Sequence, residues 1–366
     1  MKLLVSFLAS VALAAALPHS ARPCGMFVPA TVASNPAIAA QRALVIVRAN
    51  TIELHLQPHA AGDGAAFAWI IPVPAVPTVS LGDAAVFSAL DQLTTPHVTL
   101  TQKDSGGGIG CGSADAGGGL RNVDDGIQHF GGGTLGDYTY DTIQGNTAEA
   151  VETWLTDNGY VLPDGFATTI APYVGHPFVA VKLAAGASEA DLQPLVIRYE
   201  RGFDTSVGYA LGLSRASTTD VAPVLIWVLA DKRYRVANYA SAELKTLAEV
   251  MREQADSGAE ADYQAAVTQV TAESSGRIAF TEFARELDAD ADPALSALRD
   301  ADAHYLTRLY MEVPKAEIED LVITFAANAP DVSPTQTAAA PHEAPMTAAC
   351  IGLAVVALGL LRRRAR

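Results

Sequence analysis

Positive charge is scarce in this chain of 366 residues. Its 24 Lys and Arg residues are set against 40 Asp and Glu residues, which gives a formal net charge of −16. Six of the basic residues lie in the two ends, so the part between them has 18 basic and 40 acidic residues, a net charge of −22. A surface of this sign repels phosphate backbones and excludes nucleic acid as an expected partner. It is typical of a soluble exported protein, or of one that associates with cations.

The chain also lacks the short motifs of common enzyme sites. It has no Gly-Lys-Ser/Thr for a phosphate loop, no Gly-x-Ser-x-Gly for a hydrolase elbow and no His-Glu-x-x-His for zinc. His55 and His59 are four residues apart, but Pro58 lies between them and His55 falls on an expected strand. We interpret them as two unrelated surface histidines. No catalytic, cofactor-binding or metal-ligating residue is predicted, although a constellation assembled across the fold stays open.

Three aspartates imitate the start of a calcium-binding loop. Asp288, Asp290 and Asp292 have the spacing of an EF-hand, but Pro293 replaces its glycine and Arg299 replaces its bidentate glutamate. We interpret them as the acidic N-terminus of a helix, with Pro293 in its first turn.

Glycine is concentrated in two segments, 105–119 and 131–136, which we expect to be flexible loops. The second matches Gly-x-Gly-x-x-Gly, but a dinucleotide site requires a helix after this motif. Residues 137–144 favour a strand instead, so we reject a dinucleotide site.

Cysteine occurs only three times. Cys24 and Cys111 lie in the expected exported part, and Cys350 lies in an apolar tail. Because two cysteines in an oxidising compartment commonly pair, Cys24 and Cys111 are candidates for a disulfide. Two free buried thiols are the alternative.

The N-terminus, residues 1–22, has the pattern of a secretory signal peptide. Lys2 is followed by an apolar stretch over 3–17 that is too short for a stable membrane span, with alanines that suit cleavage. A lipid on Cys24 is disfavoured, because Arg22 and Pro23 occupy positions where a lipoprotein has small residues.

The C-terminus predicts a membrane anchor. Residues 346–361 carry no charge, and the Arg-rich end 362–366 follows directly. Sixteen helical residues span about 24 Å, which is short for a hydrocarbon core of about 30 Å but tolerable with local thinning. The arginines belong on the cytoplasmic side. Residues 326–345, rich in Pro, Ala and Thr, are expected to be a linker to the exported domain.

The domain itself, residues 24–325, is predicted to be α+β, with a largely antiparallel, β-rich N-terminal part and a helical C-terminal part. A break between two subdomains is possible near residue 235. Strands are expected over 43–48, 51–57, 67–73, 98–102, 137–144, 178–183, 194–200, 207–213, 224–229 and 321–325. Helices are expected over 83–93, 146–159 (capped by Asn146, with Glu149 in a capping box), 241–254, 263–271 and 293–313.

Several segments, in order, resemble the bacterial domain of unknown function 2330 family. They lie between about residues 24 and 333: FAWIIPVPAVP from Phe67, WLTDNGY from Trp154, FVAVKL from Phe178, IWVL from Ile226 and YLTRLY from Tyr305. Ala240 departs from the family, which tends to have proline after its Asn-Tyr pair. The tail also resembles the short sorting tails of some exported proteins, although Cys350 lies inside the apolar run and not before it.

The resemblance implies an exported, envelope-associated protein, but it assigns no activity and no site residue. We therefore expect a protein exported across the inner membrane, anchored by its tail, that acts as a non-enzymatic binding or structural module for an unknown surface ligand. The alternative is a periplasmic or extracellular hydrolase whose active site is framed by the two Gly-rich segments.

Overall fold

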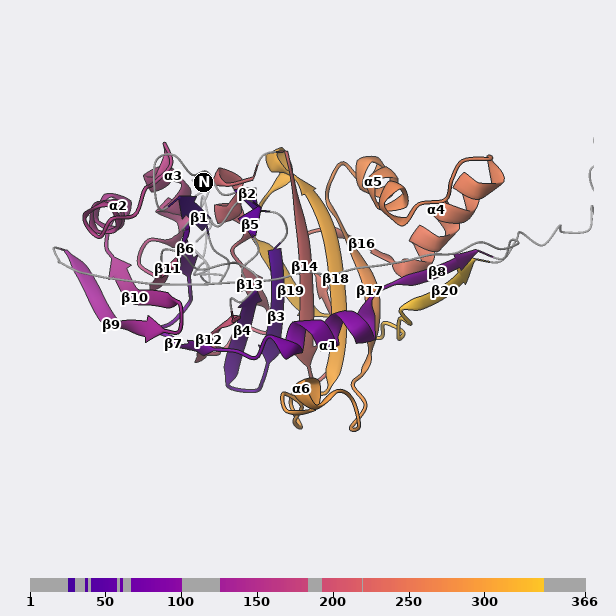
Figure 1. Ribbon diagram of the computed structural model, residues 1–366, viewed down its shortest axis with the longest axis horizontal. Coiled ribbons are helices and arrows are strands. Elements are labelled where there is room, and N and C mark those ends of the chain that lie inside the picture. Colours follow the sequence, from indigo (N-terminus) through magenta and orange to yellow (C-terminus); the bar gives the residue numbers. More distant parts are fainter. Residues whose placement is uncertain are drawn as a thin grey trace, which may run out of the picture.

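The computed structural model describes residues 26–29, 37–38, 41–57, 60–61, 67–100, 126–183, 193–218 and 220–338. It is an α+β protein, rich in strands that are mostly antiparallel, as predicted. Figure 1 shows the helices α4 and α5 at one end of the molecule, and α2, α3 and a smaller sheet at the other.

An eight-stranded sheet is the centre of the fold. Two of its neighbouring pairs, β14 with β3 and β16 with β17, are parallel, and the others are antiparallel. It contains strands from both sides of residue 235, so both parts of the chain build one sheet. Its order is β16 (Ala240–Glu243), β17 (Ile278–Glu286), β18 (Tyr305–Pro314), β14 (Val221–Ala230), β3 (Gln41–Val47), β4 (Thr51–Gln57), β12 (Leu195–Glu200) and β7 (Thr78–Leu81).

Smaller sheets complete the β-structure. An antiparallel sheet has the order β1 (Met26–Pro29), β6 (Phe67–Pro72), β11 (Phe178–Leu183), β10 (Tyr138–Gly145) and β9 (Ile127–Leu135). A second has the order β13 (Val207–Tyr209), β19 (Leu321–Phe325) and β15 (Tyr234–Val236). Two further pairs are β20 (Thr335–Ala338) with β8 (His97–Leu100) and β2 (Ala37–Ile38) with β5 (Ala60–Ala61).

The helices are short and cover the edges and one face of this β-structure. They are α1 (Ala85–Thr94), α2 (Ala148–Asp157), α3 (Phe166–Ile170), α4 (Leu244–Asp256), α5 (Tyr263–Glu273) and α6 (Pro293–Ser296), with short 3-10 helices at Ala171–Tyr173, Leu211–Ala216 and Lys315–Glu317. The N-cap of α2 is Thr147, whose hydroxyl accepts from the amide of Ala150, and not Asn146 as predicted. Thr147 has the extended backbone that a cap requires.

The central sheet is covered on both faces, which explains the nearly continuous apolar runs of β3 and β14. One face packs against the five- and three-stranded sheets and forms the largest core cluster. The other face lies under α1 and α6, where Phe87 and Leu90 of α1 meet Leu44 and the fully buried Trp227. Figure 1 shows α1 running across this face.

The prediction of a helix over 293–313 is wrong. Only Pro293–Ser296 is helical, and Tyr305–Pro314 is strand β18, which pairs with β14 and β17. The C-terminal part is therefore a mixture of helices and long strands. Leu211–Ala216, predicted as part of a strand, is a 3-10 helix.

The expectation of a flexible loop over 131–136 is also wrong, because residues up to Leu135 belong to strand β9 and pair with β10. A strand, not a helix, follows this motif, in agreement with the rejection of a dinucleotide site. The beginning of the expected linker is packed on the domain: Val332 bridges Ala284, and β20 pairs with β8.

Several predictions fall outside the described residues. These are the signal peptide (1–22), the Gly-rich segment 105–119, the Cys24–Cys111 disulfide, and the tail from residue 339 onward, including 346–361 and 362–366. Within the described residues, no helix combines the length and the apolar character that crossing a bilayer requires.

Candidate functional site

A pocket lies at one end of the central sheet, where three strands end together. Strand β3 runs parallel to β14, and both β3 and β12 are antiparallel to β4, so β3, β12 and β14 have the same direction. The segments that follow these three strands begin at Arg48, Arg201 and Asp231. They therefore meet at the same end of the sheet. Strand β18 begins at this end of the sheet, so Asp302, which precedes it, lies beside these segments.

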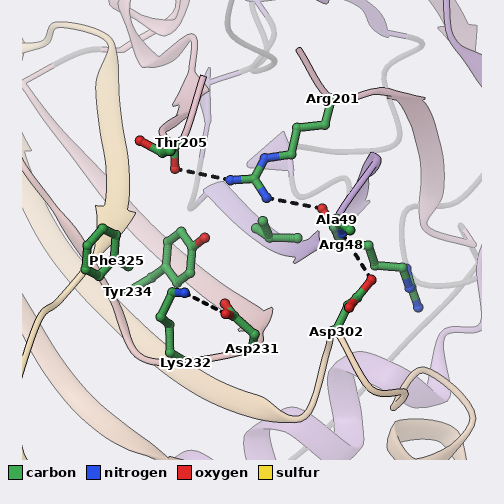
Figure 2. Close-up of a pocket in the computed structure, with 10 residues that line it drawn as sticks. Arg48, Ala49, Arg201, Thr205, Asp231, Lys232, Tyr234, Asp302 and Phe325 are labelled. Atoms are coloured by element: carbon green, nitrogen blue, oxygen red, sulfur yellow. Dashed lines mark hydrogen bonds and ion pairs between the residues drawn. The ribbon is translucent and has the colours of Figure 1, made fainter. Parts of the chain in front are cut away.

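The cavity has a volume of about 320 Å³ (Figure 2). Two of its lining residues, Val47 and Tyr234, are buried. Charged and polar side chains form its walls and rim. The lining residues are Val47, Arg48, Ala49, Arg201, Thr205, Asp231, Lys232, Tyr234, Asp302 and Phe325.

Arg48 is a structural residue of this pocket. Its guanidinium binds the carboxylate of Glu53 and donates from Nε to Asp300 Oδ2 at 2.5 Å and from Nη2 to the carbonyl of Leu298 at 3.1 Å. The amide of Ala49 donates to Asp302 Oδ2 at 3.2 Å. These bonds fix the turn between β3 and β4 against the segment that precedes β18, and all three nitrogens of the Arg48 guanidinium take part in them.

Arg201 differs from Arg48, because the acceptors of its hydrogen bonds carry no formal charge. Its Nη1 and Nη2 donate to the carbonyls of Arg48 and Thr205, each at 3.2 Å. Its guanidinium also contacts the phenol of Tyr234. Among the described residues, no carboxylate forms an ion pair with Arg201; Asp231 of the same pocket pairs with Lys232, and Asp302 accepts from the amide of Ala49.

Burial and the charge of Arg201 have opposite effects on the pKa of Tyr234. Burial raises the pKa of the Tyr234 phenol, and the neighbouring charge of Arg201 lowers it in part. The phenol therefore stays protonated at neutral pH and can donate or accept a hydrogen bond in the pocket. Figure 2 shows its hydroxyl pointing toward the cavity on the side of Arg201.

On the side of the pocket opposite Arg201, the cation of Lys232 lies near the aromatic ring of Phe325. Lys232 Nζ lies 5.3 Å from the centre of the Phe325 ring and 2.6 Å from Asp231 Oδ2. A hydrogen bond from the amide of Ala326 to the carbonyl of Arg233 holds the end of β19 beside this turn. Phe325 is 42% exposed, so part of its ring is available to a ligand.

Glu53 does not line the pocket, but it binds Arg48, which does. Its side chain is 6% exposed and binds both Arg48 and Arg198, with Arg198 Nη2 at 2.9 Å from Oε1. Burial raises the pKa of its carboxyl, but hydrogen bonds with His55 and Arg198 and the charges of Arg48 and Arg198 outweigh this effect and lower the pKa to about 2. Glu53 is therefore ionised at any pH at which the protein is expected to work.

A second cavity shares Arg201. It has a volume of about 580 Å³ and lies between the start of the loop at residues 201–206 and Pro74. Phe203, at the tip of this loop, is fully exposed. Asp204 Oδ1 accepts from both the amide and the hydroxyl of Ser206 within this loop, and Arg201 lines both cavities.

The histidine prediction needs a correction. His55 is only 5% exposed, so it is not a surface residue, and His59 lies outside the described residues. Both ring nitrogens of His55 are buried, and Nε2 lies 3.8 Å from Glu53 Oε2, so the ring faces the carboxylate whose pKa it helps to lower. The alternation of β4 predicted exposure, but α1 and α6 cover this face of the sheet.

The aspartate interpretation is confirmed in its main point. Asp292 caps α6 by accepting from the amide of Ala294 at 2.8 Å, and Pro293 occupies the first turn. Among the described residues, no three His, Cys, Asp or Glu side chains are grouped as a metal would require.

Sequence reasoning missed the pocket residues. The available signal was a charged residue immediately after each of three apolar strands, at Arg48, Arg201 and Asp231. The sequence alone does not show the order of the strands in the sheet, and these three positions are neighbours because of that order.

The comparisons with known proteins agree with the resemblance. No curated protein matches the chain significantly. A similar solved structure is a mutated baculovirus P35 after caspase cleavage, with 10% sequence identity, 78% of this chain and 99% of that chain covered, and a TM-score of 0.34, which does not establish a common fold. A family model described as "Uncharacterized protein conserved in bacteria (DUF2330)" matches residues 18–324. The chain therefore belongs to the DUF2330 family.

Proposed function

We propose that this protein is an exported, envelope-anchored and non-enzymatic binding module. The pattern of residues 1–22 supports export, and the apolar segment 346–361 followed by arginines supports anchoring. In this topology the described domain lies outside the inner membrane, and the tail is its contact with the bilayer.

We place the ligand site in the pocket of Figure 2. The observation that carries this proposal is the charge of Arg201, which has carbonyl and phenol partners but no carboxylate among the described residues. In a chain with a net charge of −16, most cations have acidic neighbours available. A guanidinium left without one, at the wall of a cavity, is suited to an anionic group supplied by a ligand.

The ligand class follows from the rest of the lining. Val47 and the Phe325 ring offer apolar contact, while Tyr234 offers a hydroxyl beside the guanidinium. This combination fits a small molecule that has a carboxylate or phosphate group and an apolar or aromatic body. The lining, as far as the structure describes it, contains no histidine, cysteine or serine.

A series of three probes tests the ligand class by isothermal titration calorimetry on the full chain. Benzoate and phenyl phosphate present the two anionic groups on the same ring, and benzamide is the neutral analogue of benzoate. At least one anion should bind at least about tenfold more tightly than benzamide, which is the difference expected when a charge-assisted bond is lost. Equal affinities for all three, or no binding of any, would contradict the proposal.

A further inference from the structure

Strand β9 forms one margin of the five-stranded sheet, at the far left of Figure 1. It has nine residues, whereas the edge strands β1, β7 and β16 of the two large sheets have four each. Among the described residues, no strand pairs with its outer side. The residues from Gln128 to Thr134 are all exposed. The amide and carbonyl groups on this side are therefore available to a further strand.

The composition of β9 offers no protection against strand pairing, and the one protective feature of this strand is a bulge near its N-terminal end. Soluble proteins place lysine, proline or inward-pointing charges on such edges. Residues 127–135 contain no Lys, Arg, Asp, Glu or Pro. A bulge opposite Thr142 and Ile143 leaves Phe130 outside the register, and its side chain is 42% exposed. The five residues after the bulge pair regularly with β10.

This edge is held in place, although three of its residues are glycines. His129 Nε2 lies 2.7 Å from Asp141 Oδ1 on β10, which ties the two strands together through their side chains. A Cβ at Gly132 would lie 2.4 Å from the same Asp141 oxygen and 2.6 Å from the Tyr140 carbonyl. Gly132 is therefore required for the close approach of Asp141, and the glycine run belongs to an ordered strand.

The glycines also leave space on the sheet surface. Gly131 and Gly133 share one face, and a Cβ at Gly133 would meet only the Tyr140 ring, at 3.6 Å. A neighbouring strand could cover this gap with bulky side chains, as aromatic residues do beside glycine in other sheets.

We propose that β9 is a docking edge for an extended, uncharged segment of a partner protein, which adds to the five-stranded sheet as a further strand. Backbone hydrogen bonds would provide the affinity, and aromatic or β-branched side chains at alternate positions would pack over Gly131 and Gly133. A second copy of this chain is a poorer occupant, because each copy carries a net charge of −16 and the two would repel. This surface is separate from the Arg201 pocket, and the proposal does not depend on it.

A phage-displayed library of random dodecapeptides, selected on the immobilised full chain, is the probe for this edge. Enriched peptides should lack proline and charge and should alternate aromatic or β-branched residues. Their affinity should fall at least about tenfold for Gly133→Lys, which adds the charge that natural edges use. The matched control is Thr78→Lys on β7, an exposed edge position of the central sheet, which should bind normally.

The Gly133→Lys chain should retain its fold, because a Cβ there has ordinary contacts only. A thermal melt within a few degrees of the parent confirms this before binding is measured. Peptides that bind both lysine variants equally, or a library that yields no enriched sequence, would overturn the proposal. A dimer in analytical ultracentrifugation that Gly133→Lys dissociates would also overturn it, because the occupant would then be a second copy.

Discussion

Replacing Glu53 with Gln should destabilise the folded protein at neutral pH by about 3 kcal/mol. The Glu53 carboxylate lies between Arg48 and Arg198 and its side chain is 6% exposed. Glutamine keeps the shape of the side chain but removes its charge. Two guanidinium groups then lose their shared counter-ion, and Arg48 is the residue that holds the wall of the pocket.

The magnitude follows from the pKa of Glu53. This pKa is lowered from 4.5 to about 2, because hydrogen bonds with His55 and Arg198 and the charges of Arg48 and Arg198 outweigh the effect of burial. A lowered folded-state pKa contributes stability above the unfolded pKa, and the contribution is lost as the pH falls through the folded pKa. The difference between the folded and the unfolded pKa corresponds to about 3 kcal/mol at pH 7, about 1 kcal/mol at pH 3 and less than about 1 kcal/mol at pH 2.

Urea unfolding at pH 7 and pH 3 measures this contribution. The three tryptophans of the chain, Trp69, Trp154 and Trp227, are all buried and report unfolding by fluorescence. The control is Glu249→Gln on α4, whose carboxylate is 61% exposed and 3.7 Å from Lys245, and it should cost about 0.5 kcal/mol or less. A loss below about 1 kcal/mol for Glu53→Gln at pH 7, or a loss that does not shrink at pH 3, would refute the reasoning.

Three further predictions concern the ends of the chain and β9. Deleting residues 346–366 should release the protein from membranes into the soluble fraction; a truncated chain that still fractionates with membranes would show that the anchor lies elsewhere. Mass spectrometry of unreduced peptides should find Cys24 joined to Cys111, and two free thiols would disprove the pairing. Gly132→Ala should destabilise the fold by about 2 kcal/mol through its contact with Asp141, whereas Gly133→Ala should be nearly neutral; equal melting temperatures for the two variants would contradict this.

Much of the β-structure could be predicted, because apolar runs of five to seven residues report burial directly. The predicted bounds of 51–57, 178–183 and 321–325 agree with β4, β11 and β19. The polar residues of β4 were nevertheless misread. Glu53 and His55 alternate with apolar neighbours, which predicts exposure, but helices cover this face and both side chains are buried.

The failure at β18 has a related cause. Both faces of this strand are covered, so its sequence lacks the alternation that identifies a half-exposed strand. Tyr305 and Leu309, four residues apart, then imitate a continuation of the helical period of Leu295 and Leu298. Glycine misled the prediction at 131–133 for a different reason, since composition alone cannot show that Asp141 needs the space that a side chain would fill.

The pocket could be predicted least. Most of its residues lie at the ends of β3, β12, β14 and β18, and they meet because β14 lies between β18 and β3 while β4 lies between β3 and β12. Strand order depends on long-range pairing, for which a single sequence contains no local signal. The charges that follow each strand are visible in the sequence, but their convergence is not.

The affinity of an anion for Arg201→Gln tests the central claim of this account most directly; the anion is benzoate, or phenyl phosphate in its place if the parent chain binds phenyl phosphate more tightly. Glutamine retains a hydrogen-bond donor but removes the charge that has no carboxylate partner among the described residues. The control is Arg299→Gln, because Arg299 also donates to a backbone carbonyl, that of Leu287, and does not line the pocket. We predict that calorimetry on the full chain will show at least about tenfold weaker binding of this anion for Arg201→Gln and unchanged binding for Arg299→Gln. Equal binding of this anion by Arg201→Gln and the parent chain would contradict the assignment of this pocket as an anion site.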